Sequence, residues 1–213
     1  MKISLFVFNP YMENTYIYFD EVTKEAAIID PGCFSGKEFE EIDKFIDENK
    51  LSLKFILITH GHIDHILGVN YLKEKYNVPV YMHKGDNFLV EHILEYAESF
   101  GFQLEEIPEI DMEITPELNL KLGNTNLEFL HTPGHSPGGV CIVDRNNKNI
   151  FCGDLIFRDS IGRTDLPKSD FKTLMNSIEE VLFVKCEDDF RLFPGHMEST
   201  TIEQEKNHNQ FLI

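Results

Sequence analysis

The chain has 213 residues, 42% of them hydrophobic, and carries a formal net charge of −18. This length and composition predict a single domain over residues 1–213 with a sizeable core. So acidic a surface argues against a nucleic-acid partner, whose phosphates need Lys and Arg contacts, and no apolar stretch approaches the roughly 20 residues of a membrane span.

In the first half of the chain, short apolar runs alternate with segments whose apolar residues have helical spacing. Asn9-Pro10 ends the first run and no small-residue cleavage site follows, so we expect a strand rather than a signal peptide, and a cytoplasmic location. The expected elements, in chain order, are strands at 3–8, 15–19 and 26–29, a helix that begins at a capping box of Ser35 and Glu38, a strand at 54–58, a helix from about Ile66 to Tyr76, a strand at 78–82 and a helix from about Asp86 to Gly101.

The strand at 54–58 leads into the most informative segment of the chain. Residues 59–65 read Thr-His-Gly-His-Ile-Asp-His and so place His60, His62, Asp64 and His65 close together. Histidine and carboxylate are the usual non-thiol zinc ligands, and a strand end can aim them at one point. The intervening glycine lets the backbone come close to a metal. The spacing therefore predicts a metal site rather than a histidine-rich surface loop.

The second half of the chain repeats one order three times: apolar or turn residues, and then a His or an Asp. His135 follows Pro133-Gly134, Asp154 follows the apolar run at 149–152, and His196 follows Pro194-Gly195. Because open α/β sheets place ligands at strand ends along one rim, we expect these residues to meet the earlier cluster. Together the candidates exceed what one ion needs and suit two ions with open positions. The remaining expected elements are strands at 127–130, 139–143, 149–152 and 189–193, a helix after Ser169 and a helix near Thr200 and Thr201.

The ordered set of His60, His62, Asp64 and His65, then His135, Asp154 and His196, resembles the metallo-β-lactamase fold superfamily over essentially the whole chain. The segments at 153–157 and 161–167 are similar to short, single-domain relatives of glyoxalase II (hydroxyacylglutathione hydrolase). The resemblance implies an α/β fold, the αβ/βα sandwich of two mixed β-sheets covered by helices. It also implies two Zn²⁺ ions per chain, with Fe or Mn as other options: one held by His60, His62 and His135, one held by Asp64, His65 and His196, and Asp154 bridging the two.

The activity that the resemblance implies is hydrolysis of a small thioester, such as a hydroxyacyl-thiol, by a metal-bound hydroxide. Asp64 would also act as a catalytic residue that guides a proton. Arg163 and Lys168 are candidates to bind a substrate carboxylate, since a guanidinium can grip one with two hydrogen bonds. The alternative for Arg163 is a buried pair with Asp165 that shapes the loop beside Asp154. The expected partner is a small-molecule thioester, and nothing in the sequence indicates an oligomeric state.

Two features differ from the relatives. Ile213 follows His196 closely, so we expect no C-terminal helical region of the kind that helps full-length glyoxalase II to grip glutathione. Met197 stands where relatives often have Gly, which is expected to alter the pocket wall. Iron-dependent persulfide dioxygenases share the fold and a Gly-Arg-Thr-Asp segment, so the sequence leaves that activity open. A lactonase and a non-enzymatic metal-binding protein are further alternatives. Asp30 is expected to support a ligand histidine without touching a metal.

Overall fold

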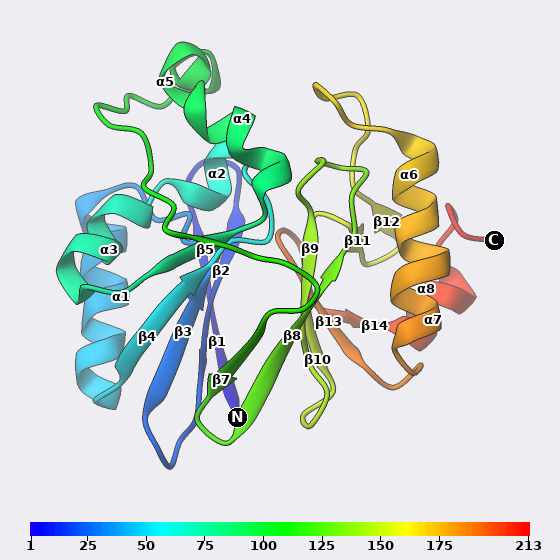
Figure 1. Ribbon diagram of the computed structural model, residues 1–213, viewed down its shortest axis with the longest axis horizontal. Helices are drawn as coiled ribbons and strands as arrows, with labels where there is room; N and C mark the ends of the chain where they lie inside the picture. Colours follow the sequence, from blue (N-terminus) through cyan, green and yellow to red (C-terminus); the bar gives the residue numbers. More distant parts are fainter.

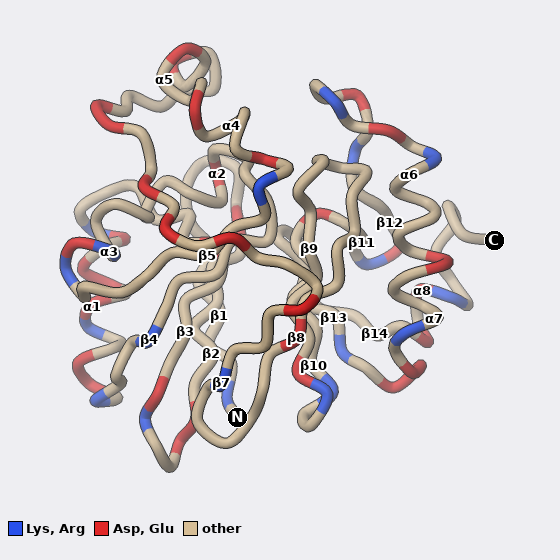
Figure 2. The backbone as a smooth tube through the Cα atoms, viewed as in Figure 1, with Lys and Arg blue, Asp and Glu red and all other residues tan.

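The fold is a sandwich of two sheets with helices on the outer faces, as Figure 1 shows for the computed structural model, which describes residues 1–213. The expected α/β sandwich of two mixed sheets is thus confirmed. None of the helices is both long enough and apolar enough to cross a membrane. Figure 2 shows Asp and Glu spread over the helices and loops of both halves rather than gathered in one patch.

The first sheet is built from the N-terminal half of the chain. Its strands are, in spatial order, β1 (Lys2–Phe8), β2 (Glu13–Phe19), β3 (Glu25–Ile29), β4 (Ser52–Leu57), β5 (Val80–Met82) and β6 (Met112–Glu113). The pairs from β1 to β3 are antiparallel, whereas those from β3 to β6 are parallel. The carboxyl ends of β4 and β5 therefore meet at one edge.

The second sheet comes from the C-terminal half. Its spatial order is β14 (Thr200–Thr201), β13 (Arg191–Pro194), β10 (Asn149–Gly153), β9 (Val140–Asp144), β8 (Thr125–His131) and β7 (Asn119–Leu122). Only the pair of β10 and β13 is parallel. A separate two-stranded sheet of β11 (Ile156–Phe157) and β12 (Ser160–Ile161) follows β10.

Helices cover the outer face of each sheet (Figure 1). In the first half, α2 (Ile63–Ile66), η1 (Lys84–Asp86), α4 (Asn87–Glu91), α5 (Ile93–Tyr96) and η2 (Ala97–Phe100) belong to the end of the sheet where β4 and β5 terminate, and the covering helices are α1 (Gly36–Asn49) and α3 (Val69–Tyr76). In the second half they are α6 (Phe171–Asn176), the π-helical turn η3 (Ser177–Leu182), α7 (Phe183–Lys185) and α8 (Ile202–His208). Ser35 and Glu38 form the expected capping box of α1.

Strand alternation divides the core into three layers. On β2, Tyr16 and Tyr18 point between the sheets and pack with Phe151 and Phe193, while Ile17 points out toward the helices of the first half. The outer face of the second sheet buries a third cluster beneath α6, η3 and α8. The strongly apolar runs of the sequence thus fill both faces of each sheet.

Two expected helices differ from the structure. The helix expected from Ile66 begins three residues earlier, inside the ligand cluster, and is interrupted at Leu67 and Gly68. The interruption has a physical cause, because Gly68 N donates to the Pro31 carbonyl and a side chain at Gly68 would clash with Cys33 Sγ. The helix expected over residues 86–101 is likewise divided, into η1, α4, α5 and η2.

Candidate metal centre

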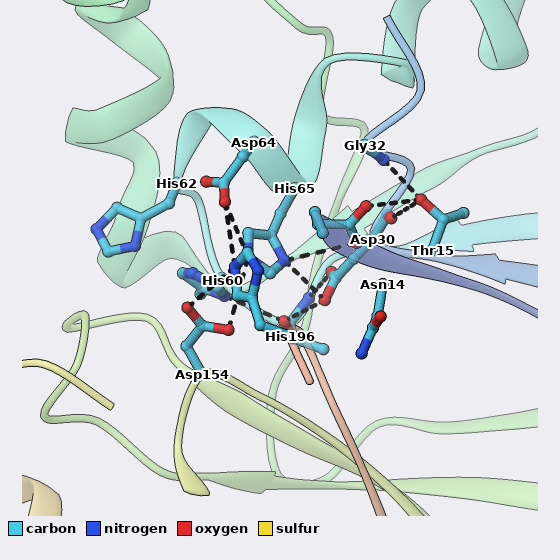
Figure 3. A network of polar contacts seen from close by, with 12 residues as sticks. Asn14, Thr15, Asp30, Gly32, His60, His62, Asp64, His65, Asp154 and His196 are labelled. Atoms are coloured by element: carbon cyan, nitrogen blue, oxygen red, sulfur yellow. Dashed lines mark hydrogen bonds and ion pairs between the residues drawn. The ribbon is translucent and has the colours of Figure 1, made fainter. Parts of the chain in front are cut away.

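The seven candidate ligands lie at one end of the two sheets. His60 and His62 follow β4, Asp64 and His65 lie on α2, and His135 lies in the loop after β8. Asp154 and His196 follow β10 and β13. All of these strands end at the same rim, so the repeated order in the sequence reflects one shared position in space. Figure 3 shows Asp64, His65, Asp154 and His196 pointing toward one another across the gap between the halves.

The ligand atoms fall into two groups that share Asp154. One ring nitrogen from each of His60, His62 and His135 lies within 4.8 Å of the other two. The same holds for one ligand atom from each of Asp64, His65 and His196. Asp154 lies between the groups: Oδ2 is 3.5 Å from His135 Nε2 and 3.6 Å from His196 Nε2, and Oδ1 is 3.6 Å from His65 Nε2. This is the same division that the resemblance implies.

The chemistry of these residues fits a pair of metal ions. Three buried atoms that face the centre, His60 Nε2, His65 Nε2 and Asp154 Oδ1, have no hydrogen-bond partner. Buried polar atoms rarely stay unpaired because the lost hydration is costly, and a bound cation would satisfy all three. The ligands are nitrogen and oxygen atoms with no thiolate, a set that suits zinc, iron or manganese.

Backbone carbonyls and a buried carboxylate orient the ligand rings. His135 Nδ1 lies 2.8 Å from the Arg163 carbonyl oxygen and His196 Nδ1 lies 3.1 Å from that of Tyr11, so both rings turn Nε2 toward the centre. Asp30 Oδ2 lies 3.2 Å from His65 Nδ1, and the same carboxylate accepts hydrogen bonds from the backbone N–H and hydroxyl of Thr59. Asp30 also forms a third group with His60 and His65, whose ligand atoms lie within 4.8 Å of one another, so its supporting role stays a prediction.

Sequence reasoning missed Asp86, which joins two ligand loops. Its fully buried carboxylate accepts hydrogen bonds from Gly61 N at 2.8 Å, Ser136 Oγ at 2.7 Å and Gly138 N at 2.6 Å. Gly61 lies between His60 and His62, and Ser136 follows His135. The only signal in the sequence is an Asp placed after a strand of the same sheet, and the same signal also predicts the start of a helix.

The two candidate substrate residues lie in different surroundings. The Arg163 guanidinium donates to both carboxylate oxygens of Asp165, at 2.6 Å and 2.8 Å. The alternative for Arg163 was a buried pair with Asp165. The pair is present, but it is not buried, because the two side chains are 64% and 69% exposed. Lys168 is also exposed, with Nζ 3.6 Å from the centre of the Phe88 ring. Arg163 is one of the residues that line the pocket described in the next paragraph, whereas Lys168 is not.

A pocket of about 560 Å³ opens above the two ligand groups. Its floor includes His62, Asp64, His135, Asp154 and His196. The walls are Tyr11, Ile63, Leu89, Tyr96, Phe100, Phe157, Ser160, Ile161, Arg163, Leu166, Pro167 and Met197. The centre can thus be reached by a small molecule, as expected for a catalytic rather than a structural metal site.

His60 and His62 of one ligand group differ from His65 and His196 of the other in the pKa of their rings in the metal-free protein. Burial lowers the pKa of His60 well below its usual value and that of His62 to about 3. Burial also acts to lower the pKa of His65 and of His196, but the carboxylates of Asp64 and Asp154 outweigh it and raise both.

We therefore expect the two groups to lose metal at different pH values. A proton competes with the metal for each histidine, so the raised pKa values of His65 and His196 predict that their group is emptied first as pH falls. Metal content measured after dialysis at steps from about pH 8 to about pH 5 should decrease in two stages. In His62→Ala, which damages the other group, the remaining metal should be lost in the earlier stage. A single stage for both ions in the wild type would contradict this expectation.

Comparison with known proteins gives a consistent result. The family model described as Metallo-beta-lactamase superfamily matches residues 9–196. The chain is 38% identical to the hydroxyacylglutathione hydrolase GloC of Haemophilus influenzae, over 100% of the chain and 98% of that protein. It is 34% identical to the probable metallo-hydrolase YqgX of Bacillus subtilis, over 95% of the chain and 93% of that protein.

Two solved structures have the same fold over nearly their whole length. The B3 metallo-beta-lactamase BLEG-1 matches with a TM-score of 0.88 at 32% identity and covers 99% of both chains. TTHA1623 in a di-iron-bound form matches with a TM-score of 0.86 at 34% identity, over 98% of this chain and 100% of that one. A site able to hold two ions is thus found in a structure of closely similar shape.

Proposed function

The chain belongs to the metallo-beta-lactamase superfamily, and on that basis we propose that this relative of metallo-hydrolases cleaves a small thioester with the help of two metal ions. The observation that carries the proposal is the position of Asp154 between two groups of ligands whose buried atoms lack partners. The thioester is favoured because a hydroxyacylglutathione hydrolase is 38% identical over the entire chain.

His60, His62 and His135 would hold one ion, Asp64, His65 and His196 the other, and Asp154 both. When bound, such a pair lowers the pKa of a water molecule and polarises a carbonyl oxygen. In the overall reaction, the oxygen of water forms a bond to the acyl carbon, the carbon–sulfur bond breaks, and one proton of the water passes to the departing sulfur, which leaves as the thiol. No external oxidant or reductant is needed.

The residues of this chain fix the geometry and the charge at the floor of the pocket. Asp64 Oδ2 lies 3.2 Å from His196 Nε2. Burial opposes ionisation of Asp64, but His65 and His196 outweigh it and hold the pKa of this carboxyl well below its usual range. Asp64 therefore stays a carboxylate at neutral pH, where it would accept a hydrogen bond and orient the attacking water rather than deliver a proton.

The proposal is tested by metal analysis combined with two activity assays. We expect close to two ions per chain. We also expect hydrolysis of S-lactoylglutathione or of S-benzyl thioacetate that stops when the metal is chelated and returns when zinc, iron or manganese is added back. Oxygen uptake with glutathione persulfide and no thioester cleavage would instead support the persulfide dioxygenase alternative. Hydrolysis that persists in fully metal-free protein would contradict the proposed mechanism.

A further inference from the structure

The walls of the pocket are apolar on both sides. Ile63, Leu89, Tyr96 and Phe100 come from α2, α4, α5 and η2 in the first half of the chain. Phe157, Ile161, Leu166, Pro167 and Met197 face them from the second half. Tyr11 at the turn before β2 and Phe100 are 42% and 41% exposed, so large apolar surface remains open to solvent at the mouth. Exposed apolar surface beside a polar floor is typical of a ligand-binding site.

The polar groups of these walls are mostly paired within the protein. The hydroxyl of Tyr11 donates to the Phe100 carbonyl at 3.1 Å, and that of Tyr96 donates to the Leu89 carbonyl at 2.8 Å. Both rings therefore present mainly carbon to the pocket. Besides the tyrosines and the ligands of the floor, Ser160 and Arg163 are the only polar residues of the lining.

The walls offer no unpaired cation. Arg163 is the only Lys or Arg in the lining, and both of its hydrogen bonds go to Asp165. The same contact lowers the pKa of the Asp165 carboxyl to about 2, so the partner stays charged at every relevant pH. A bidentate pair of this kind has little charge left for a third group. A substrate carboxylate could take the Nε–Nη2 edge of the guanidinium only by displacing Asp165, and at the remaining Nη1 side it would meet an ion pair with no net charge.

Met197 adds apolar surface at a backbone position that does not favour a side chain. Its φ angle is 67°, in the left-handed region where glycine is the least strained residue. The residue follows His196, its carbonyl accepts a hydrogen bond from Asn14 Nδ2 at 2.8 Å, and its side chain lines the pocket. A glycine at this position would make the same backbone hydrogen bond with less strain. What the methionine adds is therefore its apolar side chain in the pocket wall.

We propose that this pocket binds a thioester whose larger substituent is apolar and uncharged, and that the walls select against carriers with carboxylates, such as glutathione. The inference rests on the proposed hydrolysis for its reaction, but the walls that carry it are separate from the metal ligands. The carbonyl lies over the polar floor, and the apolar substituent lies between Phe100 and Tyr96 on one side and Phe157 and Met197 on the other.

The first test compares two thioesters with the same acyl group. S-benzyl thioacetate is neutral and apolar, whereas S-acetylglutathione carries carboxylates. For each thioester, kcat/KM is divided by the rate constant of its hydrolysis by hydroxide without the protein. This ratio should be about tenfold or more higher for S-benzyl thioacetate than for S-acetylglutathione, as expected for apolar contacts of this size. An equal or higher value for S-acetylglutathione would overturn the inference.

A binding measurement separates this inference from the proposed function. Benzyl methyl sulfide and S-methylglutathione cannot be hydrolysed, and their dissociation constants can be measured by NMR titration of the metal-loaded protein. Benzyl methyl sulfide should bind more tightly. If it does and neither thioester is cleaved, the proposed function fails while the pocket assignment stands. If S-methylglutathione binds more tightly, the assignment fails whatever the activity.

Three variants locate the selectivity in the walls. Met197→Gly should lower kcat/KM for S-benzyl thioacetate severalfold more than for S-acetylglutathione, while the melting temperature does not fall because the strain is relieved. Lys24→Gly, at an exposed position with φ of 63°, is the matched control and should change neither rate. Asp165→Asn, which leaves Arg163 with a net charge, should raise kcat/KM for S-acetylglutathione only. Equal changes for both substrates in Met197→Gly and Asp165→Asn would overturn the inference.

Discussion

Asp154→Ala is expected to lower hydrolysis by about a thousandfold or more and to reduce the metal content below two ions per chain. One carboxylate lies 3.5 to 3.6 Å from nitrogen atoms of both ligand groups, so its removal takes a ligand from each proposed ion. It also removes the negative charge that lies between the histidines of one ligand group and those of the other. Elemental analysis and steady-state rates of the same preparation would measure the two effects together.

A suitable control is Asp47→Ala, which removes an exposed carboxylate in the last turn of α1, next to the start of β4, whereas the ligands follow the opposite end of that strand. It should retain two ions and full activity. Asp154→Asn keeps the shape of the side chain but loses its charge, and we expect it to resemble the alanine variant in rate. Turnover at the wild-type level in a folded Asp154→Ala would show that the two groups do not share this ligand.

Asp86→Ala is expected to have the second largest effect, on stability and metal affinity together. The change leaves Gly61 N, Ser136 Oγ and Gly138 N without their buried acceptor, which should cost about 3 kcal/mol or more in free energy of unfolding. It also frees the loop of His60 and His62 from that of His135. Affinity for the ion that His60, His62 and His135 would hold should therefore fall by about 10-fold to 100-fold. Urea unfolding of the metal-free protein and zinc titration would measure these two quantities.

The matched control for Asp86 is Ser136→Ala, which removes one of the three donors and should cost about 1 kcal/mol. A positioning role predicts that the zinc affinity of the group of His60, His62 and His135 falls while that of the group of Asp64, His65 and His196 is retained. If both affinities fall equally, or if only stability changes, Asp86 stabilises the fold as a whole and does not position the group of His60, His62 and His135 in particular.

The main strands could be predicted from the sequence because their signals are local, whereas the layering of the sandwich was implied by the family resemblance. The capping box at Ser35, the apolar runs and the dense segment at 60–65 each depend on residues close together in the chain. The strands that were missed are β6, β7, β11, β12 and β14, which have two to four residues each. So few residues carry no measurable alternation, and their pairing with neighbours makes them strands.

Long-range contacts account for most of the remaining differences. Asp86 meets Gly61 and Gly138 across 25 and 52 positions of sequence, and no local pattern announces such a meeting. Arg163 and Asp165 lie two residues apart, so their pairing could be expected, but their exposure depends on where the loop after β12 lies. The interruption at Gly68 likewise results from close packing on the segment at 31–33.

The division of the ligands between the halves has a thermodynamic consequence. The group of His60 and His62 is completed by His135, and the group of Asp64 and His65 is completed by His196, so each bound ion would cross-link two parts of the chain that have separate sheets. An ion that binds only the assembled halves stabilises them by mass action, at about 1.4 kcal/mol for each tenfold rise in free metal well above its dissociation constant. The concentration of free metal would then set the folded fraction of the chain as well as its rate of hydrolysis.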